Sequence, residues 1–205
     1  FLDHHLRAAV LADRRRLLEG GQRFAGLDWT GRTGVALVTE YDRDRRWRTT
    51  SLLDLASPAA ARILFDLAAN DAYRDPGDPV METRPSGERV ALQDGDAIYL
   101  AGDGASETGD RPFLDRFSLA TLKNARLFRC DEERLETFLA FVGTSRAQAL
   151  VRSESKADPP NLFVVDLASG ARRKLTDTRD PTPELTRVTK ELVKYARKDG
   201  VPLSG

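Results

Sequence analysis

Short apolar runs separated by polar turns make up most of this sequence. Three of them share one plan, an apolar strand that ends at a glycine: RFAGLDWTG (23–31), PVMETRPSG (79–87) and LETFLAFVG (135–143). The closing glycines Gly31, Gly87 and Gly143 are evenly spaced (87 − 31 = 143 − 87 = 56). Because glycine reaches the positive φ values that tight turns need, this spacing predicts a structural repeat.

Three further strands are predicted after each of these glycines. The second strands are 34–41, 97–102 and 148–154, the third are 52–57, 116–121 and 164–169, and the fourth are 61–66, 125–131 and 171–177. The third and fourth strands are the most alike between units: LLDLAS, RFSLAT and VVDLAS are each followed by a turn and then by Ala-Arg. The pattern therefore predicts units of four strands each.

An incomplete copy of the unit, residues 6–21, precedes the first glycine. Units of four strands at a period of about 40 to 60 residues are typical of β-propeller blades, which bury their faces by stacking on one another. The predicted fold is therefore all-β, a partial β-propeller of about three four-stranded blades plus part of a fourth. We expect the blades to occupy residues 1–187.

Two segments carry a competing helical signal. In SPAAARILFDLAAND (57–71), Ser57 could cap a helix, Pro58 suits a first helical position, and alanine is frequent. CDEERLETFLAF (130–141) is also rich in helix formers. Since tertiary context often overrides local propensity, the repeat favours a strand at 61–66 with a helical turn beside it.

Composition excludes several classes of function. The chain has 205 residues, of which 40% are hydrophobic, and its 32 basic residues equal its 32 acidic ones. Without a basic excess, nothing indicates a nucleic-acid partner or an anionic membrane surface. No apolar run approaches the ~18 residues of a membrane span. The single cysteine, Cys130, allows no disulfide within the chain and is expected to be a buried or half-buried strand residue.

Nucleophilic chemistry has no candidate residue here. The G-x-S-x-G nucleophile motif is absent, since GASET (104–108) and GTSRA (143–147) lack the final glycine and read as turns. His4 and His5 are the only histidines, and they precede every serine. Adjacent strand residues face opposite sides of a sheet, so this pair makes a poor metal site and reads as an edge strand.

Metal and phosphate sites are not indicated either. GDGASETGD (102–110) is acidic and rich in glycine, but it lacks the spacing of a calcium loop and no G-K-[ST] follows. We interpret it as a long hairpin loop. The carboxylate pairs Asp42/Asp44 and Asp94/Asp96 are read as turn residues. We therefore expect no catalytic residue, no metal and no cofactor in this chain.

Several phrases of this sequence resemble the propeller of the prolyl oligopeptidase family, and within it the glutamyl endopeptidase branch of bacteria and plant chloroplasts. They are TEYDRDRRWRTTSLLDL (39–55), DPGDPVMETRPSG (75–87), RPFLDRFSL (111–119) and RKLTDTRDPTPELTRVTKELVKYARKDGVPLSG (173–205). In that family a propeller precedes an α/β-hydrolase domain. The resemblance implies that residues 188–205 form the crossing strand or linker toward a hydrolase domain beyond Gly205.

The resemblance also implies a function. The family's Ser-Asp-His triad lies in the hydrolase domain, so no catalytic residue is carried onto this chain. The propeller caps the active site and restricts access to short or unfolded peptides. If cleavage follows glutamate, an arginine fork is the best partner for the substrate carboxylate. Because first strands line a propeller channel, Arg84 and Arg23 are the candidate substrate-binding residues.

Two other readings stay open at this stage. A stand-alone propeller that binds proteins or peptides is the main alternative, and a periplasmic scaffold with a similar propeller is another. Three blades and a remnant cannot close, which leaves open sheet faces, so we expect the isolated chain to self-associate. The compartment expected from the resemblance is the bacterial cytoplasm or periplasm, or the chloroplast stroma for a plant protein.

Overall fold

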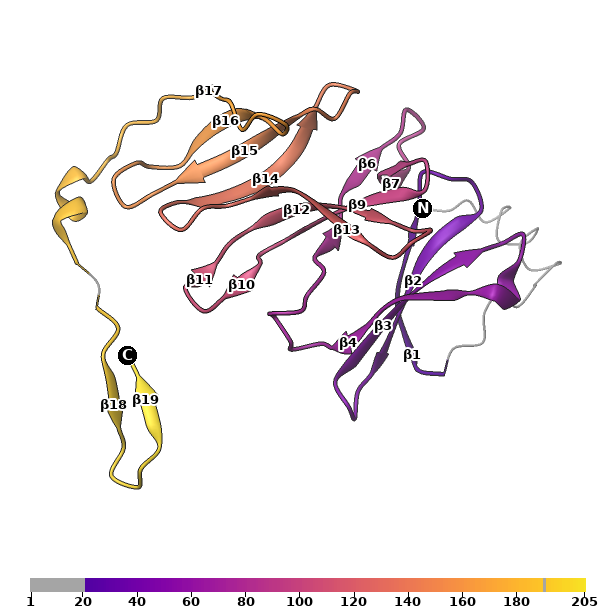
Figure 1. Cartoon of the computed structure of the whole chain (residues 1–205), viewed down its shortest axis with the longest axis horizontal. Helices are drawn as coiled ribbons and strands as arrows, with labels where there is room; N and C mark the ends of the chain where they lie inside the picture. The colour runs from indigo at the N-terminus through magenta and orange to yellow at the C-terminus, as the bar shows by residue number, and fades with distance from the viewer. Residues whose placement is uncertain (1–20, 190) are drawn as a thin grey trace, which may run out of the picture. The chain divides into compact units, whose positions relative to one another are not determined.

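The computed structural model describes residues 21–189 and 191–205, and nearly all of their regular structure is β-strand (Figure 1). The chain divides into two compact units, Phe1–Glu132 and Glu133–Gly205. His4 and His5, and all but the last residue of the incomplete unit at 6–21, lie outside the described residues. Within the described part, no helix is long and apolar enough to cross a membrane.

The first sheet is an antiparallel meander in sequence order. Its strands are β1 (Arg23–Trp29), β2 (Val35–Asp42), β3 (Trp47–Asp54) and β4 (Arg62–Ala68). The competing helical signal produces only a 3-10 turn, η1 (Pro58–Ala60), before β4 begins. Leu64 and Leu67 of β4 are buried. The strand predicted at 61–66 is therefore confirmed, because burial of these leucines in the sheet outweighs the helical propensity of the segment.

The second sheet has the strand order β13-β12-β9-β5, with β8 paired to one end of β9. Its strands are β5 (Asp78–Pro79), β8 (Gln93–Asp94), β9 (Ala97–Gly102), β12 (Phe113–Ser118) and β13 (Asn124–Arg129). The predicted hairpin loop at 102–110 carries a short two-stranded ladder, β10 (Ala105–Ser106) and β11 (Gly109–Asp110).

The single first strand predicted at 79–87 is wrong. The chain leaves the sheet after β5 and forms a separate hairpin of β6 (Met81–Thr83) and β7 (Arg89–Ala91). Gly87 closes its turn at φ 83°, and its N–H donates to the Arg84 carbonyl oxygen. The repeat predicted no strand in residues 88–96, but this segment forms β7, which pairs with β6, and β8, which pairs with β9.

The third sheet lies in the second unit and contains all four predicted strands. They are β14 (Leu135–Val142), β15 (Gln148–Glu154), β16 (Asn161–Asp166) and β17 (Arg172–Lys174), paired in that order. A 3-10 turn, η2 (Pro183–Arg187), follows, and then an exposed hairpin of β18 (Lys194–Ala196) and β19 (Pro202–Ser204). The assignment of 188–205 to a crossing strand or linker stays a prediction.

The third strand of every unit was predicted too far along the chain. The observed strands β3, β12 and β16 each begin three to five residues earlier than predicted, and the repeated Ala-Ser or Ala-Thr lies in the following turn. Asp166 Oδ1 accepts hydrogen bonds from the N–H groups of Ala168 and Ser169, and Asp54 Oδ1 accepts one from Ala56. The aspartate thus ends the strand, because its side chain replaces ladder bonds with a local turn.

A hydrophobic core joins the first two sheets inside the first unit. It contains Leu37, Leu64, Ala91, Ile98, Leu100, Phe117 and Leu119. The rings of Phe65 on β4 and Phe117 on β12 lie 4.8 Å apart, centroid to centroid. Successive four-stranded meanders with a core between their faces are the architecture of propeller blades. The predicted class, an all-β partial propeller, is confirmed.

Other sequence predictions concern single residues. Cys130 is buried, one position past the end of β13. Asp42 Oδ1 accepts hydrogen bonds from the N–H groups of Asp44 and Arg45, as expected of a turn residue. Gly31 does not have the positive φ predicted for it; Gly34 does, at 76°. The turn after β1 therefore bends three residues later than the repeat implied.

Candidate functional site

Arg84 and Arg23, the substrate-binding candidates from the sequence, lie far apart in the first unit. The Arg84 guanidinium donates a hydrogen bond to the carbonyl oxygen of Gly31 and lies 3.8 Å from the Glu88 carboxylate. Arg23 is exposed at the opposite end of β1. A strand rises about 3.3 Å per residue, so roughly 20 Å separates Arg23 from the far end of β1, next to Gly31. The structure therefore does not bring the two arginines to one ligand.

The contacts of Arg84 tie the β6–β7 hairpin to the end of β1. Thr30 bridges Ala91 in parallel, and the Gly31 N–H donates to the Ala91 carbonyl oxygen at 3.0 Å. A side chain at Gly31 would meet the Gln93 Cβ at 3.1 Å. Gly31 is thus required for close approach of two backbones rather than for a turn conformation.

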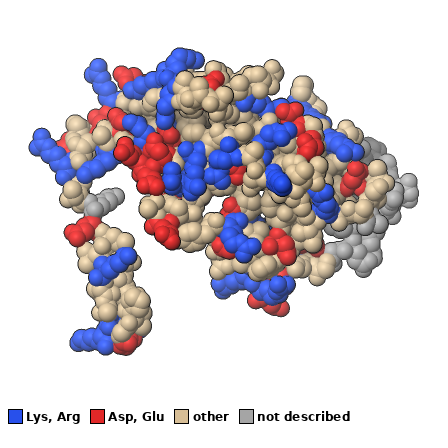
Figure 2. Space-filling view, viewed as in Figure 1, with Lys and Arg blue, Asp and Glu red and all other residues tan. Residues whose placement is uncertain are grey.

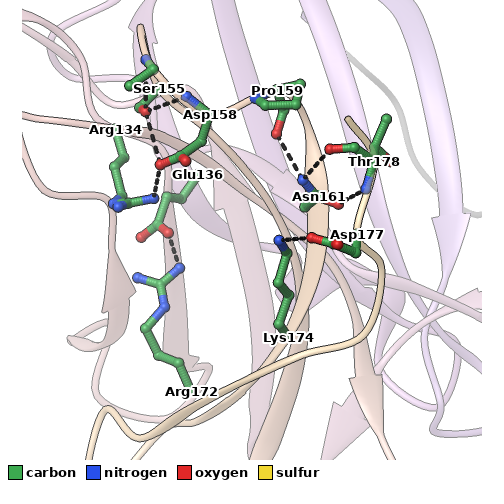
Figure 3. A network of polar contacts seen from close by, with 11 residues as sticks. Arg134, Glu136, Ser155, Asp158, Pro159, Asn161, Arg172, Lys174, Asp177 and Thr178 are labelled. Carbon is green, nitrogen blue, oxygen red and sulfur yellow. Dashed lines mark hydrogen bonds and ion pairs between the residues drawn. The ribbon is translucent and has the colours of Figure 1, made fainter. Parts of the chain in front are cut away.

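The third sheet carries a cavity of about 660 Å³ on one face, and all of its lining residues belong to the second unit. Phe163, Pro159 and Pro183 supply apolar surface, and the remaining lining residues are polar or charged. Figure 3 shows the polar contacts around it. We take this cavity as the candidate functional site.

A row of three polar residues crosses the sheet beneath the cavity. Glu136 on β14 pairs with Ser153 on β15, which pairs with Asn161 on β16. All three are buried, with exposed fractions of 2 to 4%. Side chains alternate between the faces of a strand, so Glu136 and Ser153 share a face with the next pair, Phe138 and Val151. At one end of the third sheet, polar side chains therefore lie on the same face as the buried apolar residues Phe138 and Val151.

Glu136 is held by an arginine from the outermost strand. The Arg172 guanidinium donates to Glu136 Oε1, and it lies over the Phe163 ring at 5.1 Å from the centroid. Arg134 lies on the other side of the same carboxylate (Figure 3). A carboxylate that loses its water on burial needs such charged partners, so the pair explains how Glu136 is tolerated on a core face.

Asn161 fastens the segment that follows β17 to the sheet. Its Oδ1 accepts hydrogen bonds from Thr176 Oγ1 at 2.9 Å and from the Thr178 N–H at 2.8 Å. Its Nδ2 donates to the carbonyl oxygens of Pro159 and Thr178. The amide is therefore fully occupied in building the cavity wall, and its hydrogen-bonding capacity is not left over for a ligand.

The rim of the cavity carries two ion pairs. Arg134 Nη1 lies 3.4 Å from Asp158 Oδ2, and the Lys174 ammonium donates to Asp177 Oδ1. The hydrogen bond from Lys174, followed by its positive charge, lowers the pKa of Asp177 below its ordinary value. Figure 2 shows basic and acidic side chains interspersed on the surface, in keeping with the zero net charge. The rim is therefore a mixed surface rather than a field of one sign.

The second sheet holds a buried carboxylate in a similar way. Asp115 on β12 is 2% exposed, and Arg126 on β13 contacts both of its oxygens. Arg126 also lies over the Phe113 ring, at 4.5 Å from the centroid. Arg126 and Arg172 are the arginines of the repeated Ala-Arg phrase that precedes or opens each fourth strand.

Neither buried carboxylate was predicted from the sequence, although a signal was present. Glu136 lies in phase with apolar residues of its strand, and so does Asp115. A strand carboxylate in phase with apolar neighbours, together with an arginine opening the fourth strand, is the pattern that could have found the pairs. For metal binding, no group of three or more His, Cys, Asp or Glu side chains comes together among the described residues.

No protein-family model matches this chain. It is 30% identical over 196 residues to "Probable glutamyl endopeptidase, chloroplastic" of Oryza sativa subsp. japonica, which covers 89% of this chain and 21% of that protein. The protein of the same name from Arabidopsis thaliana is 28% identical over 197 residues, covering 89% of this chain and 20% of that protein. The chain thus spans about a fifth of the length of the curated relatives it matches.

Solved structures give weaker likenesses. TolB from Acinetobacter baumannii has a TM-score of 0.43 at 14% identity, over 78% of this chain and 34% of that one. Oligopeptidase B from Leishmania major has a TM-score of 0.44 at 11% identity, over 92% of this chain and 32% of that one. Likenesses at this level do not bear on function. In sequence the chain is thus similar to proteins named probable glutamyl endopeptidase, and its successive antiparallel meander sheets are those of a β-propeller.

Proposed function

We propose that this chain is the non-catalytic propeller region of a serine peptidase, which restricts access of peptides to an α/β-hydrolase domain. The observation that carries the proposal is the 30% identity, over 196 residues, to a protein named probable glutamyl endopeptidase. The two stacked sheets of its first unit supply a rigid wall, and its buried carboxylates Asp115 and Glu136 are held in ion pairs within their own sheets. On this proposal the substrates are peptides, and cleavage follows glutamate.

The test uses the full-length protein that contains this chain. We expect hydrolysis of short glutamate-containing peptides and little hydrolysis of the same sequence inside a folded protein. A pair of cysteines that links neighbouring blades should reduce hydrolysis of longer peptides more than that of a dipeptide substrate. Absence of any peptidase activity in the full-length protein would instead support a stand-alone peptide-binding propeller.

Arg84 and Arg23 stay the proposed partners of the substrate glutamate, and their separation means that at most one of them contacts it. Arg84→Gln should lower kcat/KM for glutamate substrates by about tenfold or more while leaving glutamine analogues unchanged. Arg23→Gln removes the other candidate and is measured with the same substrates. If neither substitution changes the glutamate-to-glutamine ratio, the assignment of both residues is wrong.

We also propose that the isolated chain self-associates through its first sheet. Phe24, Leu27 and Ile63 are exposed there, and Phe24 is 63% exposed. Light scattering on the isolated chain should show oligomers that grow with concentration, whereas a monomer at high concentration would exclude this. For the compartment, we propose the bacterial cytoplasm or periplasm, or the chloroplast stroma in a plant, to be tested by fractionating cells that express the tagged full-length protein.

A further inference from the structure

The cavity on the third sheet contains a buried hydroxyl that the protein does not use. Ser153 is 2% exposed and lines the cavity, yet its Oγ has no hydrogen-bond partner among the described residues. A buried polar group without a partner loses its hydration and gains nothing in return, so such groups are rare in folded proteins. The hydroxyl is therefore positioned as if for a group that enters the cavity.

The acceptor groups beside Ser153 are already engaged within the protein. Asn161 has both sides of its amide occupied, and Glu136 accepts from Arg172. Arg172 carries five N–H donors, of which one is used in a hydrogen bond between described residues. Its side chain is 32% exposed, and it lines the cavity flat over the Phe163 ring. The floor of the cavity thus has spare donor capacity in one guanidinium and one hydroxyl.

The rim adds a further positive charge at the mouth. Arg179 lines the cavity and is exposed, and it makes no ion pair with another residue in the described part of the chain. The rim pairs Arg134–Asp158 and Lys174–Asp177 have carboxylates that are 58% and 86% exposed. Exposed charges are screened by solvent and salt, so these two carboxylates repel an incoming acidic group only weakly. The third carboxylate of the lining, Asp180, accepts a hydrogen bond from the Thr182 N–H.

We propose that this cavity binds the carboxylate of an acidic ligand, with Arg172 and Ser153 as its donors and Arg179 at the mouth. A guanidinium edge matches the two oxygens of a carboxylate, and such charge-assisted bonds are roughly twice as strong as neutral ones. The carboxylate is that of an acidic side chain or of a peptide C-terminus, since both present the same oxygens. The site goes beyond the proposed gating role and does not depend on peptidase activity.

The test measures binding to the full-length protein by titration calorimetry with four small probes. Acetyl-glutamate amide carries a side-chain carboxylate, acetyl-alanine carries a terminal one, and acetyl-glutamine amide is the neutral isostere of the first. Inorganic phosphate is the fourth. We expect at least one carboxylate probe to bind about tenfold more tightly than the neutral amide and than phosphate, and the tighter carboxylate identifies the source. Equal binding of all four, or no binding at all, overturns the proposal.

Two variants locate the site. Ser153→Ala should weaken the carboxylate probe by about five- to tenfold, and Arg172→Lys, which keeps the charge beside Glu136, by about tenfold. Ser51→Ala is the matched control, because Ser51 is a buried serine of the first sheet outside the cavity. If Ser153→Ala binds as the wild type does, the cavity is not the site.

Ser153→Ala also separates a ligand-binding hydroxyl from a structural one. A hydroxyl with no partner in the free protein contributes no stability, so the thermal midpoint of Ser153→Ala should equal or exceed that of the wild type. A midpoint well below the wild-type value would mean that Ser153 has a structural partner and would overturn the proposal. The proposed function can fail while this binding is observed, and the reverse also holds.

Discussion

Removing Arg172 should destabilise the third sheet far more than removing its partner Glu136. The Glu136 side chain is 3% exposed and that of Arg172 is 32% exposed. Breaking a buried ion pair from one side typically costs about 3–5 kcal/mol. Because Arg172 is partly solvated and Arg134 lies on the other side of the carboxylate (Figure 3), we expect Arg172→Met to cost about 2–3 kcal/mol in unfolding free energy.

Substitution of Glu136 instead leaves the partly exposed Arg172 without its ion-pair partner. In Glu136→Gln the side chain keeps its shape and an acceptor oxygen, and Arg172 can turn toward water, so we expect a cost of about 1 kcal/mol. The double variant should cost less than the two single variants together, by about 1–2 kcal/mol, because no buried charge is then left alone.

Hydrogen exchange of the β14–β17 amides measures this sheet separately from the first unit. Arg152→Met is the control, since its pair with Glu154 lies on the same sheet with the arginine 46% exposed, and it should cost about 0.5 kcal/mol or less. Equal costs for Arg172→Met and Glu136→Gln, or a fully additive double variant, would refute the view that burial of the carboxylate governs the energetics.

Three further predictions concern the first unit. Gly104→Ala should cost more than about 3 kcal/mol in unfolding free energy measured by urea titration, because φ is 64° and the new Cβ would clash with the Arg111 carbonyl oxygen. Gly170→Ala in the second unit, with φ 72° and open space, should cost about 1–2 kcal/mol in the same urea titration. Phe117→Ala should cost about 3–5 kcal/mol by the same titration, since Phe117 is 3% exposed, and an effect no larger than that of the exposed Phe24→Ala would contradict its place in the core. Hydrogen bonds from Thr49 and then Trp47 lower the pKa of Asp66 below its ordinary value of 3.8. The ionised carboxylate therefore stabilises the fold above pH 3.8, and this stabilisation is lost as the pH falls through the lowered pKa. In Asp66→Asn the thermal midpoint should accordingly fall less steeply than that of the wild type between about pH 6 and pH 2.

The periodicity of the sequence predicted most of the strands and their grouping, although the single first strand predicted at 79–87 was wrong. Alternating apolar positions and evenly spaced glycines predicted the four strands of the third sheet, two of which begin at the predicted residue. The prediction of these strands succeeds because local turns connect the strands of each meander. Both the turn type and the alternation of side chains along a strand depend on residues that are neighbours in sequence. The strand at 61–66 was predicted from the repeat against the local helical signal, and it prevails because Leu64 and Leu67 are buried in the sheet.

Only the tertiary structure decided which polar residues are buried and what they contact. Glu136 and Ser153 come together through pairing of separate strands, and Arg172 reaches Glu136 from a strand 36 residues further along the chain. Arg84 likewise reaches Gly31 across 53 residues. Such contacts depend on register and on which face of a sheet is covered, and neither is fixed by residues that are neighbours in sequence. The repeat therefore predicted the sheets, whereas the cavity and its ion pairs required their pairing in space.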